Sequence, residues 1–267
     1  NTFKNSRIFN QPISNWSVSN VTNMGGMFFN AYLFNQPIGN WDMSNVTLTA
    51  TMFFNATTFN NGGSTDISGW NTSSISNAIF MFANCTNFNQ PIGNWNVSNI
   101  TTMFLMFRNA IEFNNGGSSD ISGWDTSKVT NMQQMFEFAE NFDQPIGRWN
   151  LNNVTSMTQF CNGASKFNNG NSTDISGWVF PKVTTLQQLF TNSSFNQPIG
   201  SWDTSNITNM SSIFNSTPFN QNIADWNIAK VTSLSSVFNN SQFNQDISGW
   251  NTSNVTNMFS LFNNNSS

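Results

Sequence analysis

The sequence contains no histidine, and only 7% of its 267 residues are charged. Histidine is the commonest general base and the commonest metal ligand in proteins, so its absence removes the usual basis of both kinds of site. Eight basic residues stand against 12 acidic ones, which leaves no basic stripe for nucleic-acid phosphates and no polybasic patch for a membrane. The composition therefore argues against nucleic acid as a partner and leaves any catalysis to carboxylates.

Cysteine and long apolar runs are also scarce. Cys85 and Cys161 fall at different positions of units that lie several coils apart, so we expect no disulfide between them. No run of 18 apolar residues occurs, which predicts no membrane-spanning helix. The chain does not begin with Met and has no signal-like segment, so we expect a mature or trimmed product. Asn, Ser, Thr and Gln replace charge, which is typical of a protein outside the cell or on a cell or virion surface.

Ten tryptophans mark the register of an internal repeat. They are 24, 25 or 29 residues apart: Trp16, Trp41, Trp70, Trp95, Trp124, Trp149, Trp178, Trp202, Trp226 and Trp250. An isoleucine precedes each tryptophan by three residues, and Val or Ile follows each by five. Because these apolar positions recur in every unit, we interpret them as packing positions of ten stacked coils. The repeat predicts a single solenoid domain over residues 1–267.

Each coil is predicted to contain one short strand and one short helix. Residues 38–43 have the alternating apolar spacing of a strand. The apolar residues after the first tryptophan follow the helical pattern i, i+3, i+6, i+7 and i+10: Val21, Met24, Met27, Phe28 and Ala31. Crossover helices between parallel strands favour a right-handed path. The predicted fold is a right-handed α/β solenoid, a superhelix of about ten coils of 24–29 residues.

A column of asparagines follows the second conserved phenylalanine of each unit. Its members are Asn10, Asn35, Asn60, Asn89, Asn114, Asn168, Asn196, Asn220 and Asn244, with Asp143 as the sole substitute. Asn at a coil corner can accept from a backbone amide and donate to a carbonyl of the next coil, so we interpret the column as a structural ladder. An ionised Asp143 cannot donate, and we expect a water or an exposed carbonyl to compensate. Cys161, where nine coils have Phe, is expected in the core.

The two halves of the motif, W-D-x-S-N-V-T-x-M-x-x-M-F and F-N-Q-x-I-x-x-W, together resemble a known repeat. It is the mycoplasma surface-protein repeat of unknown function, which is akin to BspA-like leucine-rich repeats, and the resemblance covers the whole chain. The resemblance implies a leucine-rich-repeat-like solenoid on a secreted or cell-surface protein with a role in adhesion. It supplies no catalytic residues.

Alternate coils carry four extra residues between the ladder asparagine and the isoleucine. These inserts are FNNGGSTDISGW from Phe59, FNNGGSSDISGW from Phe113 and FNNGNSTDISGW from Phe167. Their spacing of two coils predicts a row of aspartates on one edge: Asp66, Asp120 and Asp174. Such loops are candidates for contact with a partner, a second protomer or Ca²⁺. The alternative is a Gly-rich turn capped by Asp, which the incomplete match to calcium-binding nonapeptides favours. No pocket that would raise a carboxyl pKa is evident, so a hydrolase pair is not supported.

A second polar column directly follows the tryptophans in eight coils. Its members are Asp42, Asn71, Asn96, Asp125, Asn150, Asp203, Asn227 and Asn251. We expect these side chains to point outward from the strand, where they are candidates for binding glycans or proteins, by analogy with other solenoids. The alternative is a solvent-facing column whose stacked amides bond one another.

Two further columns contain threonine and glycosylation sequons. The regular threonines raise the idea of ice binding, but their place after the predicted strand favours helix capping: Thr22, Thr47, Thr101, Thr130, Thr155, Thr184, Thr208, Thr232 and Thr256. Six sequons share one phase and are candidate glycosylation sites in a suitable host: Asn20, Asn45, Asn99, Asn153, Asn206 and Asn254.

The chain starts and ends mid-repeat, because Phe3 and Phe262 occupy the same position of the unit as Phe28. Open solenoid ends predict either a longer array of coils or head-to-tail stacking of protomers into a filament. The sequence therefore predicts a non-enzymatic structural or adhesive protein without a cofactor, whose partner is itself or a cell-surface protein or glycan. The alternative is a binding module for glycans or Ca²⁺.

Overall fold

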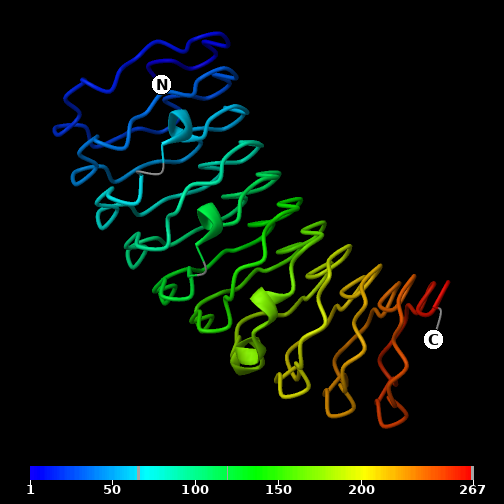
Figure 1. The fold of residues 1–267 in the computed structure, drawn as a ribbon. Helices are drawn as coiled ribbons and strands as arrows, with labels where there is room; N and C mark the ends of the chain where they lie inside the picture. Colours follow the sequence, from blue (N-terminus) through cyan, green and yellow to red (C-terminus); the bar gives the residue numbers. More distant parts are fainter. Residues whose placement is uncertain (65–66, 119, 266–267) are drawn as a thin grey trace.

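The computed structural model describes residues 1–64, 67–118 and 120–265. The chain winds through coils that lie side by side along one axis, and its two termini lie at opposite ends of the stack (Figure 1). Equivalent residues of adjacent coils pair in parallel, from Asn23 with Leu48 to Ser233 with Asn257. The fold is therefore a stack of repeated coils. We number the coils by their tryptophans, so that coil 5 contains Trp124.

The helix and the strand predicted for each coil do not occur in these residues. Their helices are short 3-10 segments: η1 (Asn61–Gly63), η2 (Asn115–Gly117), η3 (Asn169–Asn171) and η4 (Thr173–Gly177). None of the helices found in the described ranges is long and apolar enough to cross a membrane. Parallel pairing outside them takes the form of isolated bridges. The prediction of one strand and one helix per coil was wrong, and the leucine-rich-repeat likeness and the right hand stay predictions.

Backbone hydrogen bonds explain the failure of the helical pattern. Every second amide from Met24 to Asn30 donates to a carbonyl of the next coil at 2.8–3.0 Å: Met24, Gly26, Phe28 and Asn30. Of the amides between them, Met27 and Phe29 donate three residues back within the coil at 3.0 and 3.2 Å, and Gly25 donates to Asn23 Oδ1 at 2.8 Å. Consecutive turns thus bring apolar side chains to the interior every three residues. The spacing resembles that of a helix, although half of the amides bond along the stack.

In the turns after each tryptophan, two residues four positions apart have positive φ and interrupt any helix. The second of them forms a column in which asparagine recurs: Asn30 (58°), Asn55 (62°), Asn84 (60°) and Asn109 (56°). Asparagine tolerates this left-handed conformation better than most residues. The side-chain amides of these residues also bond from coil to coil at 2.7–3.1 Å. This second asparagine ladder was missed in the sequence, where only the spacing of Asn residues could have indicated it.

One continuous hydrophobic core runs through the described coils. Phenylalanine rings stack along it, as Phe107 does with Phe113 of its own coil at 4.1 Å and with Phe136 of the next at 5.6 Å. Nine tryptophans donate Nε1–H to the isoleucine carbonyl of the preceding coil at 2.9–3.3 Å. Each therefore fills the core and satisfies a buried carbonyl. Cys85 and Cys161 are buried free thiols, as predicted.

Candidate functional site

The asparagine column after the second phenylalanine is a hydrogen-bonded ladder. Each side-chain Oδ1 accepts the backbone N–H of the equivalent residue in the next coil at 2.8–3.0 Å. Asp143 takes part in the ladder as an acceptor, because its Oδ1 accepts from the amides of Asn168 and Gly170 at 2.8 Å each. Asn89 accepts in the same way from Asn114 and Gly116. The ladder requires an acceptor only, so an aspartate fulfils it as well as an asparagine.

The eight polar residues that follow tryptophan are exposed but do not extend from a strand. The Oδ1 of each accepts the backbone N–H two residues later at 3.0–3.2 Å: Asp42, Asn71, Asn96, Asp125, Asn150, Asp203, Asn227 and Asn251. Such a bond forms an Asx turn. The outward placement is therefore confirmed and the strand was wrong, and one oxygen of every member of this binding candidate serves its own turn.

The threonine column caps no helix. The Thr47 hydroxyl donates to the carbonyl of Thr22 at 3.1 Å, and the bond recurs from Thr130 to Thr101 and from Thr155 to Thr130 at 3.1 and 3.0 Å. The column thus links successive coils through its hydroxyl groups. The capping prediction was wrong because the segment after each threonine is a series of turns.

The sequon asparagines also bond along the stack. The Nδ2 of five of them donates to a carbonyl of the preceding coil at 2.7–3.3 Å: Asn45, Asn99, Asn153, Asn206 and Asn254. An N-linked glycan is attached to this nitrogen, so glycosylation would compete with these bonds. Lys128, Lys182 and Lys230 donate to the Oδ1 of three of the same asparagines at 2.6–2.9 Å. Glycosylation at these sites and at Asn20 stays a prediction.

The inserts of coils 3, 5 and 7 lie in a row along the stack, where Figure 1 shows η1, η2 and η3 one after another. In each insert the second asparagine is fully buried: Asn61, Asn115 and Asn169. Its Oδ1 accepts the isoleucine N–H of the preceding coil at 2.7–2.8 Å. These asparagines were missed in the sequence, where the change from F-N-Q to F-N-N was their signal.

The three insert aspartates have no common site among the described residues. Asp66 lies outside the part of the chain that the structure describes. Asp120 Oδ1 accepts from the N–H and the hydroxyl of Ser122 at 2.8 and 2.6 Å, whereas Asp174 Oδ1 accepts from Asn169 Nδ2 at 2.8 Å. Within residues 1–64, 67–118 and 120–265, no group of three His, Cys, Asp or Glu side chains could hold a metal ion. Asp120 thus caps a turn, as the alternative reading proposed.

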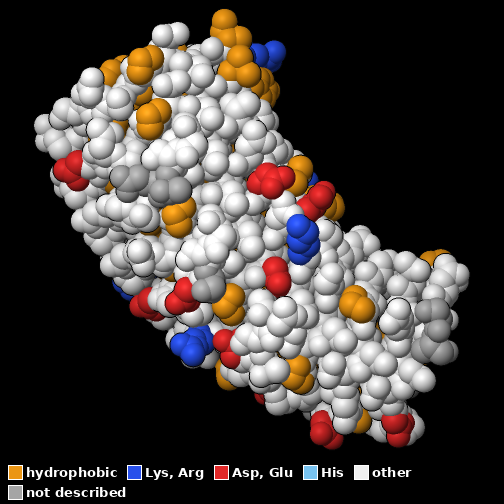
Figure 2. All heavy atoms as spheres, in the orientation of Figure 1, with side chains coloured by type: hydrophobic (Ala, Val, Ile, Leu, Met, Phe, Trp, Pro, Cys, Tyr) orange, Lys and Arg blue, Asp and Glu red, His pale blue; other side chains and the backbone are white. Residues whose placement is uncertain are grey.

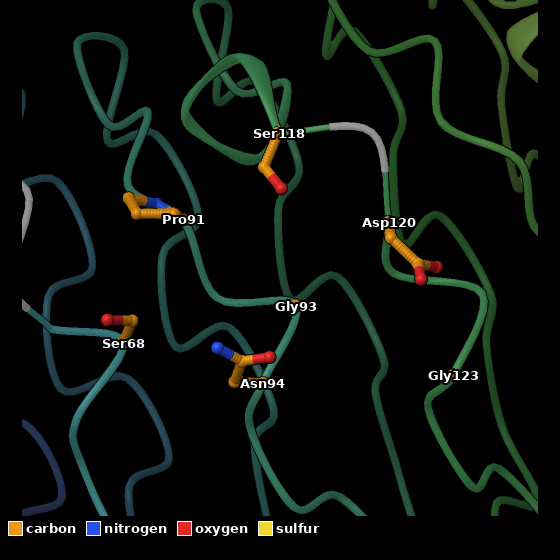
Figure 3. Close-up of a pocket in the computed structure, with 7 residues that line it drawn as sticks. All are labelled: Ser68, Pro91, Gly93, Asn94, Ser118, Asp120 and Gly123. Atoms are coloured by element: carbon orange, nitrogen blue, oxygen red, sulfur yellow. The ribbon is translucent and has the colours of Figure 1, made fainter.

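A polar cleft of about 250 Å³ lies between two inserts (Figure 3). Its lining comes from coils 3, 4 and 5: Ser68, Pro91, Gly93, Asn94, Ser118, Asp120 and Gly123. In Figure 3 the short coil with Gly93 and Asn94 lies between Ser68 on one side and Asp120 on the other. The alternation of long and short coils therefore produces a recess at this edge.

The comparison with protein families agrees with the repeat. The family described as "Mycoplasma protein of unknown function, DUF285" matches residues 1–65, 62–173 and 168–267. The chain belongs to this family. The resemblance to a mycoplasma repeat is confirmed, and the relation to BspA-like leucine-rich repeats stays a prediction. No curated protein and no solved structure shows significant similarity to this DUF285 chain.

The Asx turns also shift the acidity of their aspartates. Side-chain and backbone hydrogen bonds from the serine two residues later hold the carboxyl pKa below the ordinary value of 3.8: Asp42, Asp120, Asp125, Asp203 and Asp246. Burial raises the pKa of the Cys85 and Cys161 thiols above their ordinary value of 9.0. The folded state therefore favours ionised aspartates and neutral thiols.

We predict a stability plateau in this DUF285 protein between about pH 4 and pH 9. The aspartate contribution is present above 3.8 and is lost as pH falls through the lower folded pKa values. Above 9.0 the unfolded thiols ionise while the folded ones stay neutral, so stability falls as pH rises. Urea midpoints from pH 2.5 to 10.5 measure both limits. A transition between pH 5 and 8 would contradict the prediction, and replacing both cysteines by alanine should reduce the alkaline loss.

Gly93 allows the insert of coil 5 to close on coil 4. A Cβ at this position would overlap the Asp120 carbonyl oxygen. We therefore expect Gly93→Ala to lower the free energy of unfolding by about 1–3 kcal/mol, measured by urea denaturation. Gly123→Ala is the matched control, because a Cβ there meets nothing within 4 Å. Equal effects of the two substitutions would show that the close approach at Gly93 is unimportant.

Proposed function

We propose that this chain is a non-enzymatic structural repeat protein that serves as a stiff rod outside the cell. The proposal rests on the hydrogen bonds that its polar side chains form along the axis of the stack. The asparagine ladder, the tryptophan N–H groups and the threonine hydroxyls each bond to a neighbouring coil. Every coil is thereby joined to the next by buried rings and by several columns of directional bonds, which resist bending and sliding.

The composition supports the same role. The chain has no histidine, and the Oδ1 atoms of its turn aspartates accept backbone hydrogen bonds, as in Asp125 and Asp203. Side chains engaged in turns are poorly placed to transfer protons. In its more specific form, the proposal is that the rod acts as a spacer in adhesion, or in assembly end to end or side by side.

Small-angle X-ray scattering and electron microscopy test the proposal. We expect a rigid elongated particle whose longest dimension stays constant between low and high salt, because neutral hydrogen bonds and apolar packing hold the coils together. A flexible or collapsed particle would refute the rod. Light scattering over a concentration series tests the finer form, since a strictly monomeric species would exclude self-assembly.

A binding module for Ca²⁺ is the second candidate, and the polar cleft beside Asp120 is the observation that favours it. A calcium titration followed by melting temperature separates the two candidates. A ligand that binds only the folded state raises the melting temperature with its concentration. An increase that Asp120→Asn abolishes would support the binding module, and an unchanged melting temperature would favour the rod.

A further inference from the structure

Departures from the repeat gather in coils 5 to 7. The three glutamates of the chain are Glu112, Glu137 and Glu140, and the one aspartate of the ladder, Asp143, follows shortly after them. Figure 2 shows acidic and basic side chains close together near the middle of the visible face, amid a largely uncharged surface. Because the repeat itself needs almost no charge, charged side chains at these positions require a separate explanation.

A groove of about 420 Å³ opens in this region. Six polar residues line it: Asn89, Glu112, Asn114, Asn141, Asp143 and Lys166. They come from two columns, one just before and one just after the buried phenylalanines Phe88, Phe113, Phe142 and Phe167. The packed core thus fixes both walls of the groove.

The groove retains hydrogen-bonding groups that the fold does not use. Asp143 meets both ladder bonds through Oδ1, and its Oδ2 has no hydrogen bond among the described residues. Glu112 accepts from Asn141 Nδ2 at 2.9 Å through Oε2. Among the described residues, Nζ of Lys166 has no hydrogen bond or ion pair. The groove therefore brings three charged side chains with remaining hydrogen-bonding capacity to one place.

The distance between these groups suits a ligand that is several ångströms long. The backbone amides of Glu112, Asn141 and Lys166 each donate to the preceding coil, to the carbonyls of Thr86, Ile111 and Glu140, so the three residues stand on consecutive levels. At about 4.8 Å per level, the carboxylate of the first and the ammonium of the third are roughly 10 Å apart along the rod. Asn141 lies on the level between them. A ring with polar groups around its edge can contact all three levels at once.

The hydrogen-bonding groups on the walls of the groove indicate which kind of ring it can bind. Carboxylates accept, an ammonium donates, and amides do both, which is the set that vicinal hydroxyl groups satisfy. An anionic ligand would face two carboxylates, and a cationic ligand would face Lys166. We propose that the groove binds a neutral saccharide ring of a glycan, with Glu112 and Asp143 accepting from its hydroxyls and Lys166 donating to them. This site shares no lining residue with the cleft beside Asp120 and does not depend on the rod proposal.

Asp143 offers the sharpest variant. The ladder needs an acceptor at this position, and nine coils use asparagine. Asp143→Asn therefore preserves the ladder bonds while removing the charge that faces the groove. Glu112→Gln and Lys166→Met remove the other two charges from exposed positions. Asp225→Asn, an exposed charge in coil 9, is the matched control.

The test is an array of neutral oligosaccharides of hexoses and N-acetylhexosamines, with amino-sugar and sialylated glycans on the same surface. Isothermal titration then gives the dissociation constant of the neutral oligosaccharide with the strongest signal. We expect each groove variant to weaken binding by about tenfold or more, since hydrogen bonds to charged groups contribute about 1.5–3 kcal/mol. Asp225→Asn should bind as the parent does, and the melting temperature of Asp143→Asn should be unchanged.

Three results would overturn the proposal. The first is no binding of any neutral oligosaccharide at 1 mM, and the second is binding that survives all three groove substitutions. The third is binding confined to amino-sugar or sialylated glycans, which would mean that the groove recognises charge. None of them affects the rod proposal, because scattering measures the shape of the chain without any ligand.

Discussion

Phe113→Ala is expected to lower the free energy of unfolding by about 3–5 kcal/mol. The ring of Phe113 is fully buried and stacks on Phe107 of its own coil at 4.1 Å. It also stacks on Phe88 and Phe142 of the two adjacent coils at 5.7 and 6.0 Å. Truncation removes these contacts and leaves a cavity in the middle of the stack, where rings on both sides are fixed by their own coils and cannot collapse into it.

Urea denaturation followed by tryptophan fluorescence measures this loss. Phe138→Ala is the control, because the Phe138 side chain is 39% exposed. Its backbone is left-handed, with φ of 56°, which disfavours phenylalanine and alanine alike. We expect the control to change stability by about 1 kcal/mol or less. Similar losses for the two variants would show that the stacked rings do not hold the coils together.

Asn115→Ala is expected to lower the free energy of unfolding by about 2–4 kcal/mol. The fully buried Asn115 Oδ1 accepts the Ile92 amide at 2.8 Å, so alanine leaves a buried N–H without a partner. The residue also has φ of 55°, a conformation that alanine adopts at a cost. Alanine also loses the bond from Asn115 Nδ2 to the Ser118 carbonyl at 3.4 Å, so lost hydrogen bonds and the backbone cost act together at this position.

Asn115→Gly separates the two contributions. Glycine also lacks the acceptor but adopts positive φ freely, so we expect it to recover about 1 kcal/mol relative to alanine. Asn152→Ala, at an exposed position, should remain within about 0.5 kcal/mol of the parent. Equal stabilities of Asn115→Ala and Asn152→Ala, from the same urea curves, would contradict the assigned role of the insert asparagine.

The core and the asparagine ladder could be predicted because they depend on recurrence. Ile38 and Trp41 are buried, and Asn35 bonds to the equivalent residue of the next coil, as the repeated letters indicated. A position that faces the interior of every coil accepts few side chains, so the same residue returns at the same place. That argument requires no knowledge of the backbone path. The inserts could be predicted in the same way, since a change in the length of a repeat is directly visible in the sequence.

The backbone path could not be predicted from the same letters. Apolar residues spaced by three suit a helix, and they suit consecutive turns equally well. A helix and a series of turns differ in the acceptors of their backbone amides. In this fold the amides of Met24 and Phe28 bond to the next coil. Those acceptors are 24 residues away in the sequence. A pattern of neighbouring residues therefore cannot indicate these hydrogen bonds.

The roles of the polar columns show the same division. The sequence alone places Asp42 at an exposed position of a repeated unit, and burial confirms that placement. Only the contact between coils turns Thr47 into a donor to Thr22, and only the local turn makes Asp42 an acceptor from Ser44. Likewise, Glu112, Asp143 and Lys166 are distant in the sequence, and only the stacking of the coils brings them to one groove. Recurrence dictates which residues face inward, whereas hydrogen bonds between distant residues dictate what the outward ones can do.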